Sequence, residues 1–188
     1  EIVSRDWSSD VCSSDLLTRA LFYIMDRPID KTAIAESISF QLADGLAAFE
    51  TKNFALAMQH LTPLADQGNP EAMFRVAIIN QNGLGWSQDT DKAYRYMQSA
   101  AEKGHAFAQH SLAFMYHQGE CTDVDSDLAV KWYSMAAKQG LSGSMVTLGM
   151  MYDSGDGVEE DKEMAQTWYR RAEEQQKLDD ARIDGEPE

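Results

Sequence analysis

The sequence predicts an all-α fold in which pairs of helices stack as an α/α solenoid, and three observations support this prediction. Glycine, alanine and aspartate recur at a constant spacing of 36 residues, which is typical of a repeat architecture. Within each unit, apolar residues recur at helical spacing. The chain of 188 residues contains only four prolines and few alternations of Val, Ile and Thr, which argues against an all-β fold.

The repeat is defined by several residue types that return together at the same spacing. Glycines follow the predicted helices, alanines fall where helices can approach closely, and aspartates precede the second helix of each pair. Because many positions share one period, composition alone does not explain the pattern. The clearest series are Gly68, Gly104 and Gly140; Gly83, Gly119 and Gly155; Ala93, Ala129 and Ala165; Ala100, Ala136 and Ala172; and Asp89, Asp125 and Asp161.

Each unit is predicted to contain two helices, as the third unit illustrates. Residues 107–118 carry apolar side chains one helical turn apart, and Gly119 is suited to end this helix. Asp125 is suited to cap the second helix, because its side chain can accept a hydrogen bond from a free backbone N–H. We expect the buried stripe of the second helix to be Leu128, Trp132, Met135 and Ala136, and its counterpart in the fourth unit, after the cap Asp161, to be Met164, Trp168 and Ala172.

The N-terminal part of the chain departs from this period. Thr51–Lys52–Asn53 alone forms the predicted turn of the first unit, which is therefore shorter than the others. A helix is expected to end near Glu50, and residues 17–25 are predicted as a further helix.

The first sixteen residues show neither helical nor strand periodicity. Residues 6–16 match, one after another, the translation of a sequencing adapter, and we interpret residues 1–16 as a non-native segment. A natural serine-rich tail is the alternative. On the first interpretation Cys121 is the only native thiol, and we expect the native N-terminus, with any signal peptide, to be missing. Residues 17–188 then hold 15 basic and 27 acidic residues, a net charge of −12.

The order of residues within a unit is itself characteristic. The best copy runs from Ser144 to Ala172 and contains Leu148, Tyr152, residues 155–158 (Gly-Asp-Gly-Val) and the Trp168–Tyr169 pair. This order resembles the Sel1-like repeat. The other units depart from the motif, since the third has Cys121 in place of the second glycine, the second has Asn80 in place of the tyrosine, and the short first unit is closer to a tetratricopeptide repeat.

The resemblance implies a right-handed superhelix of helix pairs with a concave groove, and a scaffold or adaptor that binds a protein or peptide without catalysing a reaction. We also expect a bacterial source. On this basis the chain divides into a non-native segment (1–16), an N-terminal helical segment (17–41), a short tetratricopeptide-like repeat (42–68), three Sel1-like repeats (69–104, 105–140 and 141–175) and an acidic, disordered tail (176–188).

In solenoids of this kind the first helix of each pair lines the groove, and positions where the repeats differ are candidates for partner binding. One exposed stripe of the first helix is predicted to supply nine such residues. The alternative is that they are merely solvated. They are Arg75, Ile78 and Asn82; Ser111, Phe114 and Gln118; and Thr147, Met150 and Ser154.

Composition excludes several other classes of function. The chain contains 16 Lys and Arg against 31 Asp and Glu, a net charge of −15, which disfavours binding to nucleic acid or to an anionic membrane surface. No stretch of the sequence is long and apolar enough to predict a membrane-spanning helix. We predict no cofactor, and the compartment stays open between cytoplasm and periplasm.

Several residues are of types found in metal, nucleotide or catalytic sites, but structural roles in the repeats explain them better. His105, His110 and His117 lie near Cys121, but their spacing is poor for zinc, so no metal site is predicted. Residues 123–134 begin like a calcium loop but lack its glycine and glutamate. Residues 83–85 (Gly-Leu-Gly) lack the strand and third glycine of a nucleotide-binding loop. We expect the acids around Cys121 to raise the pKa of its thiol, which disfavours a catalytic role.

Two alternatives to a stand-alone scaffold stay open. The chain can be a fragment of a longer repeat protein in which the repeats are a structural or regulatory module. A penicillin-binding or β-lactamase-type repeat protein is the less favoured alternative, because the relatives with that proposed role are disulfide-rich and this sequence has one credible cysteine and no Ser-x-x-Lys motif.

Overall fold

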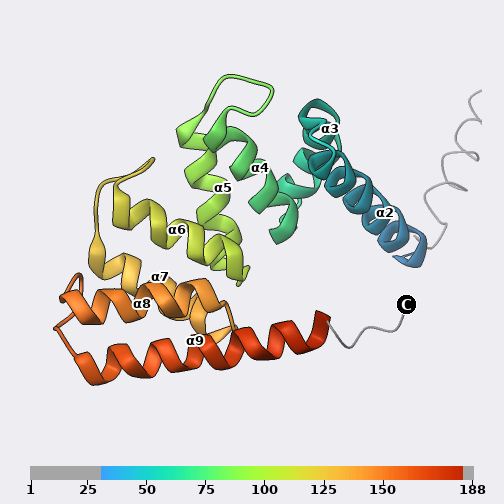
Figure 1. The fold of residues 1–188 in the computed structure, drawn as a ribbon. Coiled ribbons are helices and arrows are strands. Elements are labelled where there is room, and N and C mark those ends of the chain that lie inside the picture. The colour runs from blue at the N-terminus through green and yellow to red at the C-terminus, as the bar shows by residue number, and fades with distance from the viewer. Residues whose placement is uncertain (1–30, 184–188) are drawn as a thin grey trace, which may run out of the picture. The chain divides into compact units, whose positions relative to one another are not determined.

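The computed structural model describes residues 31–183, and this part of the chain is built from eight α-helices with no β-strand (Figure 1). The contacts divide the chain into two units, residues 1–37 and 38–188, and the repeats lie in the second. The predictions for residues 1–30 and 184–188 lie outside the described residues. The helices are α2 (Lys31–Glu50), α3 (Phe54–Asp66), α4 (Pro70–Asn82), α5 (Thr90–Glu102), α6 (Ala106–Gln118), α7 (Ser126–Lys138), α8 (Ser142–Ser154) and α9 (Lys162–Ile183).

The helices α3 to α8 have the same length, 13 residues each, and from α3 onwards each helix packs against the next one in the chain. The predicted all-α, helix-pair fold is thus confirmed. The pairs are α4 with α5, α6 with α7 and α8 with α9, preceded by α2 with α3, which are joined by a shorter loop.

The loops inside the last three pairs are closed in the same way. A glycine in the left-handed region ends the first helix, with φ of 62° at Gly83, 69° at Gly119 and 75° at Gly155. The backbone N–H of the aspartate that caps the second helix then donates to a carbonyl in the last turn of the first. These bonds are Asp89 N to Asn80 O (3.0 Å), Asp125 N to Tyr116 O (2.9 Å) and Asp161 N to Tyr152 O (2.8 Å). The residues that recur every 36 positions in the sequence therefore produce the same backbone conformation in each of these three loops.

The predicted N-caps are confirmed, and an unexpected one is added. The side chain of Asp125 accepts from Leu128 N at 2.9 Å, and that of Asp161 accepts from Met164 N at 2.9 Å. At the start of α6 the cap is instead an imidazole, because Nδ1 of His105 accepts from Ala108 N at 3.1 Å. Histidine is not among the common N-cap residues, so sequence reasoning missed this role.

The predicted buried stripes of the second helices were only partly right: Ala136 and Ala172 are buried as predicted, but the large side chains were placed wrongly. Met135 is 37% exposed and Trp132 is half-buried, whereas Tyr133 is 1% exposed and lies in one buried cluster with Ala129 and Ala137. The physical reason is that alanines let the neighbouring helices approach closely, so the interface follows the alanine positions instead of the largest side chains. The same shift occurs in α9, where Met164 is 40% exposed and the next residue, Ala165, is buried.

The short first pair follows the prediction closely. α2 ends at Glu50, and residues 51–53 form the whole turn to α3. Lys52 takes a left-handed φ of 60°, and the side chain of Asn53 caps α3 by accepting from Leu56 N at 3.3 Å.

The prediction of a disordered tail from residue 176 was wrong for its first part, because α9 continues to Ile183. Two side-chain hydrogen bonds between residues four apart support the extra turns, Gln175 Nε2 to Asp179 Oδ1 at 3.0 Å and Gln176 Nε2 to Asp180 Oδ1 at 2.8 Å. This stretch lacks an apolar period, so its helicity depends on such local bonds and on continuity with the packed part of α9. Among the helices of the described part, none has the length and hydropathy needed to cross a membrane.

The packing of α8 on α9 gives a test of the fold. A Cβ atom added at Gly149 would lie 2.5 Å from Cε1 of Tyr169, whereas one added at Gly143, in the same helix, would meet nothing closer than 3.8 Å. We expect Gly149→Ala to lower the free energy of unfolding by about 1–3 kcal/mol, because the ring must move within a packed interface. Gly143→Ala should leave it unchanged or raise it by up to about 1 kcal/mol. Urea denaturation of both variants measures the difference, and equal stabilities would contradict the packing described here.

Candidate interaction surface

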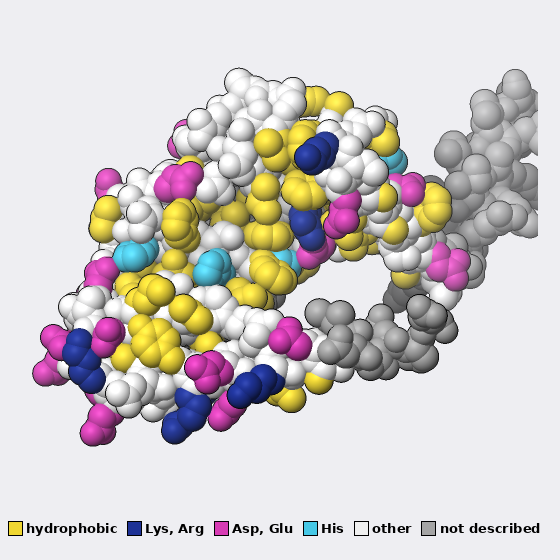
Figure 2. Space-filling view, in the orientation of Figure 1, with side chains coloured by type: hydrophobic (Ala, Val, Ile, Leu, Met, Phe, Trp, Pro, Cys, Tyr) yellow, Lys and Arg dark blue, Asp and Glu magenta, His cyan; other side chains and the backbone are white. Residues whose placement is uncertain are grey.

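The first helices α4, α6 and α8 are joined side by side through polar contacts. Nε2 of His105, at the start of α6, lies 2.8 Å from Oε2 of Glu71 in α4. Further along α6, Nδ1 of His110 lies 2.8 Å from Oγ of Ser144 in α8. The outward sides of these three helices therefore form one continuous surface, called here the first-helix face, and hydrophobic side chains form a band across it (Figure 2).

The nine predicted partner-binding residues lie on α4, α6 and α8, three on each helix, but their environments differ. Two large apolar side chains are open to solvent, since Phe114 is 43% exposed and Met150 is 58% exposed. Ile78, at the equivalent position of α4, is half-buried and packs against the core. The row formed by these three residues thus becomes more exposed from α4 to α8.

Most of the polar candidates are bonded to their own helix. Asn82 Nδ2 donates to Ile78 O at 3.0 Å, Thr147 Oγ1 to Gly143 O at 3.0 Å, and Ser154 Oγ to Met150 O at 2.9 Å. Gln118 contacts the ring of its neighbour His117. Ser111 is half-buried. These side chains therefore line the apolar row without reaching far from the helix surface.

Arg75 is not a free cation on this face. Its Nε lies 2.6 Å from Oε1 of Glu71, and its guanidinium lies 5.0 Å from the ring centroid of Phe49 and 5.6 Å from that of Phe74. Because Phe49 belongs to α2, Arg75 links the first and second helix pairs. Arg75 therefore has a structural role, and its role in partner binding stays a prediction.

On α4, α6 and α8, sequence reasoning missed one exposed aromatic residue. Phe107, in the first turn of α6, is 57% exposed and its ring stacks on Phe74 with centroids 6.2 Å apart. The equivalent positions in the other full repeats are Glu71 and Gly143, so the criterion of disagreement between repeats could have found it. Phe107 and Phe114 together give α6 the largest exposed aromatic surface of the three helices.

The three histidines near this face are structural. His105 caps α6 and bonds to Glu71, and His110 bonds to Ser144 and packs edge-on against Tyr133. Burial lowers the pKa of His110. His117 is half-buried, and its Nε2 lies 2.8 Å from Oδ2 of Asp156. Within residues 31–183, no group of three or more His, Cys, Asp or Glu side chains is arranged to hold a metal ion.

The loops that follow the first helices form one edge of the first-helix face. Glu120 begins the loop after α6 and accepts a hydrogen bond from Gln81 of α4 at 3.1 Å. Asp156, the equivalent residue after α8, bonds to Ser126 and to His117 of α6, and these bonds lower its pKa. Beside Glu120, burial raises the pKa of the Cys121 thiol, and the charges of Glu120 and Asp91 add to this effect. The loops after α6 and α8 are therefore tied to the preceding repeat.

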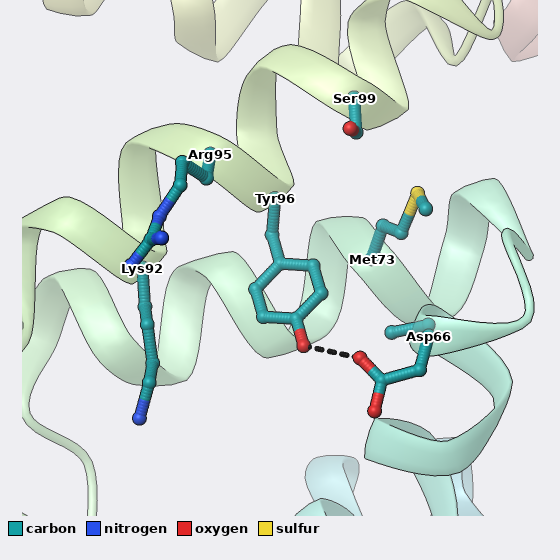
Figure 3. Close-up of a pocket in the computed structure, with 7 residues that line it drawn as sticks. Asp66, Met73, Lys92, Arg95, Tyr96 and Ser99 are labelled. Carbon is teal, nitrogen blue, oxygen red and sulfur yellow. Dashed lines mark hydrogen bonds between the residues drawn. The ribbon is translucent and has the colours of Figure 1, made fainter.

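The outer side of the array carries a separate hollow of about 400 Å³ between α3, α4 and α5. Figure 3 shows Tyr96 at its centre, with its hydroxyl donating to Oδ1 of Asp66 at 2.6 Å. Burial and this bond raise the pKa of Tyr96 to about 12. Ser99, which lines the hollow, occupies the position at which α9 has Arg171, whose guanidinium lies 4.9 Å over the ring of Trp168. Since residues of both charges line the hollow, charge does not indicate a ligand.

Comparison with known proteins agrees with this geometry. The sequence profile of the Sel1 repeat matches residues 42–69, 70–105, 106–141 and 143–177. The chain belongs to the Sel1 repeat family. A comparison with curated protein sequences found no match.

Solved structures give the same assignment. The chain is 31% identical to a Sel1 repeat protein from Oxalobacter formigenes, with a TM-score of 0.68, covering 71% of this chain and 55% of that one. It is 36% identical to c5321, a protective antigen of uropathogenic Escherichia coli with an SLR fold, with a TM-score of 0.70, covering 77% of this chain and 32% of that one. Helicobacter pylori cysteine rich protein B, at 18% identity and a TM-score of 0.51 over 68% of this chain and 91% of that one, shares the fold.

The chain thus spans about half and a third of the lengths of the first two relatives. Sel1 repeat proteins are generally protein-interaction scaffolds, and their fold is typically non-enzymatic. In such proteins the outer surface of the repeats is where a partner is expected to bind. On this chain, the first-helix face is a surface with the exposed apolar side chains described above.

The contact between α4 and α6 predicts a pH dependence of stability. The hydrogen bond from His105, with a further one from Arg75, lowers the pKa of Glu71 from 4.5 to about 2. A depressed carboxyl pKa stabilises the fold above the ordinary pKa, and this contribution is lost as the pH falls from about 4.5 toward 2. We expect Glu71→Gln to lower the free energy of unfolding by about 1–2 kcal/mol at pH 6, and by progressively less toward pH 3.

Urea denaturation at several pH values measures this effect. Glu50→Gln is the matched control, since its exposed carboxylate makes no hydrogen bond or ion pair with any residue that the structure describes. A Glu71→Gln effect of equal size at all pH values would contradict the assigned contact.

Proposed function

We propose that this Sel1 repeat protein is a non-enzymatic scaffold or adaptor that binds a protein or peptide partner along the first-helix face. The observation that carries the proposal is the exposure of Phe114 and Met150 at equivalent positions of adjacent repeats. Large apolar side chains in a row at repeat spacing offer a series of anchoring points for an extended or helical ligand.

The character of the face supports this proposal. The helices α4, α6 and α8 contain only three Asp, Glu, Lys or Arg residues, which are Glu71, Arg75 and Asp153. Depletion of charge at the centre, with aromatic residues and methionine present, is typical of protein interfaces. The polar side chains that border the row are held by their own helices, so little side-chain freedom is lost when a partner binds.

The proposal does not extend to penicillin binding or β-lactam hydrolysis, since the Helicobacter pylori neighbour is 18% identical and informs the fold alone. The proposed role is the same whether the repeats stand alone or form a module of a longer chain. In either case the partner contacts a surface that the stacked helices present.

A pair of double variants tests the proposal. Phe114→Ser with Met150→Ser removes the exposed apolar row, whereas Met135→Ser with Met164→Ser removes two similarly exposed residues from the outer helices α7 and α9. We expect affinity purification from the source cells to recover a partner with the parent protein and with the outer-helix variant, and about ten-fold less of it with the first-helix variant.

Thermal unfolding of all three proteins provides the control for folding. If both double variants recover equal amounts of every bound protein, the first-helix face is not the binding surface and the proposal fails.

A further inference from the structure

We infer that the segment bound by the first-helix face is basic as well as apolar: its apolar side chains contact Phe114 and Met150, while Lys or Arg side chains contact the acidic loops along the edge of that face. This inference rests on the proposed function and names the chemistry of the partner. It is carried by the uneven distribution of charge among loops, first helices and second helices.

The three loops between paired helices are strongly acidic. Residues 83–89, 119–125 and 155–161 contain one, three and four acidic residues, respectively, and no basic residue. In Figure 2, acidic side chains lie along the edge formed by the loops after α6 and α8. Acidity therefore increases along the array in the same direction as the exposure of the apolar row.

The rest of the repeats do not share this excess. The second helices α3, α5, α7 and α9 together contain nine acidic and nine basic residues. On the first helices α4, α6 and α8 the single Lys or Arg is Arg75, which is already paired with Glu71 at 2.6 Å. The acidic loops thus face a surface with no free cation of its own among the described residues.

The loops lie directly beside the apolar row. Each begins at the glycine that ends a first helix, one residue after Asn82, Gln118 or Ser154. The hydrogen bonds from Gln81 to Glu120 and from His117 to Asp156 hold the start of the loops after α6 and α8 against the first helix of the preceding repeat. A ligand on the row is therefore within reach of the loop carboxylates.

Some of these carboxylates already have structural roles, and others are available. Asp125 and Asp161 cap helices, and Glu160 pairs with Lys162 at 3.1 Å. Asp123 and Glu159 occupy equivalent loop positions, are exposed, and make no hydrogen bond or ion pair within the part of the chain that the structure describes. These two residues are therefore the best candidates to contact a basic ligand.

Apolar contacts and ion pairs differ in strength, so they contribute differently to binding. Exposed ion pairs are individually weak and are screened by salt, so the apolar row supplies most of the affinity. Charge at the rim acts mainly on the association rate and on the choice of partner, because acidic segments are repelled. A basic amphipathic segment satisfies both requirements.

The first test is a selection from random 16-residue peptides displayed on phage, with the intact chain as target. We expect the recovered peptides to carry net positive charge and two or more large apolar residues. They should also lose at least ten-fold in affinity for the Phe114→Ser, Met150→Ser variant and not for the Met135→Ser, Met164→Ser variant.

The second test uses the tightest selected peptide and two charge variants of equal net change. Asp123→Asn with Glu159→Gln neutralises two loop carboxylates, and Glu102→Gln with Glu174→Gln neutralises two carboxylates on the second helices α5 and α9. We expect the loop variant to weaken binding by roughly 3- to 10-fold at low salt, with little loss at 0.5 M salt, and the control variant to change it less than two-fold.

The outcomes separate this inference from the proposed function. Neutral or acidic peptides that bind the first-helix face, or equal effects of the two charge variants, would overturn the inference and leave the proposed function standing. Recovery of no peptide sensitive to the Phe114→Ser, Met150→Ser variant would count against both.

Discussion

The close stacking of each helix pair on the next is the constraint on which the rest of this structure depends. It requires a small residue wherever a ring or helix axis must approach, as at Ala129 and Ala137 around Tyr133 and at Gly149 under Tyr169. It also requires the same loop in every repeat, which the hydrogen bond from the capping aspartate to the end of the first helix provides. Stability in such an array arises from contacts between neighbouring repeats. The outward sides of the helices are therefore not needed for packing and can carry other residues.

The stacking also explains why the first-helix face contains partly buried polar bridges beside exposed apolar residues. His105, His110 and His117 each bond to a residue of a neighbouring repeat, to Glu71, Ser144 and Asp156 respectively, and so fix the spacing between α4, α6 and α8. Once that spacing is fixed, the row that contains Phe114 and Met150 is presented at a constant interval. The face is thus ordered before any partner binds, which reduces the entropic cost of association.

The fold was predictable from the sequence because its determinants are local. Gly119 and Asp125 set the backbone conformation at their own positions, so their recurrence translates directly into recurring helix ends. The burial of the large side chains was not predictable, because whether Trp132 or Tyr133 is buried depends on how the neighbouring helices pack in three dimensions. Of the surface, Phe114 and Met150 could be found because the repeats differ there, whereas the link from Arg75 to Phe49 joins separate helix pairs and carries no sequence signal.

The most direct test of the account is a methyl NMR titration of the intact chain, labelled at its methionine methyl groups, with the tightest peptide from the selection. Met150 lies on the first-helix face, and Met135 and Met164 lie on the outer helices with comparable exposure, so the three signals report the two sides of the array. The account predicts that the Met150 signal shifts or broadens as peptide is added while those of Met135 and Met164 stay in place. A response confined to Met135 and Met164 would contradict it.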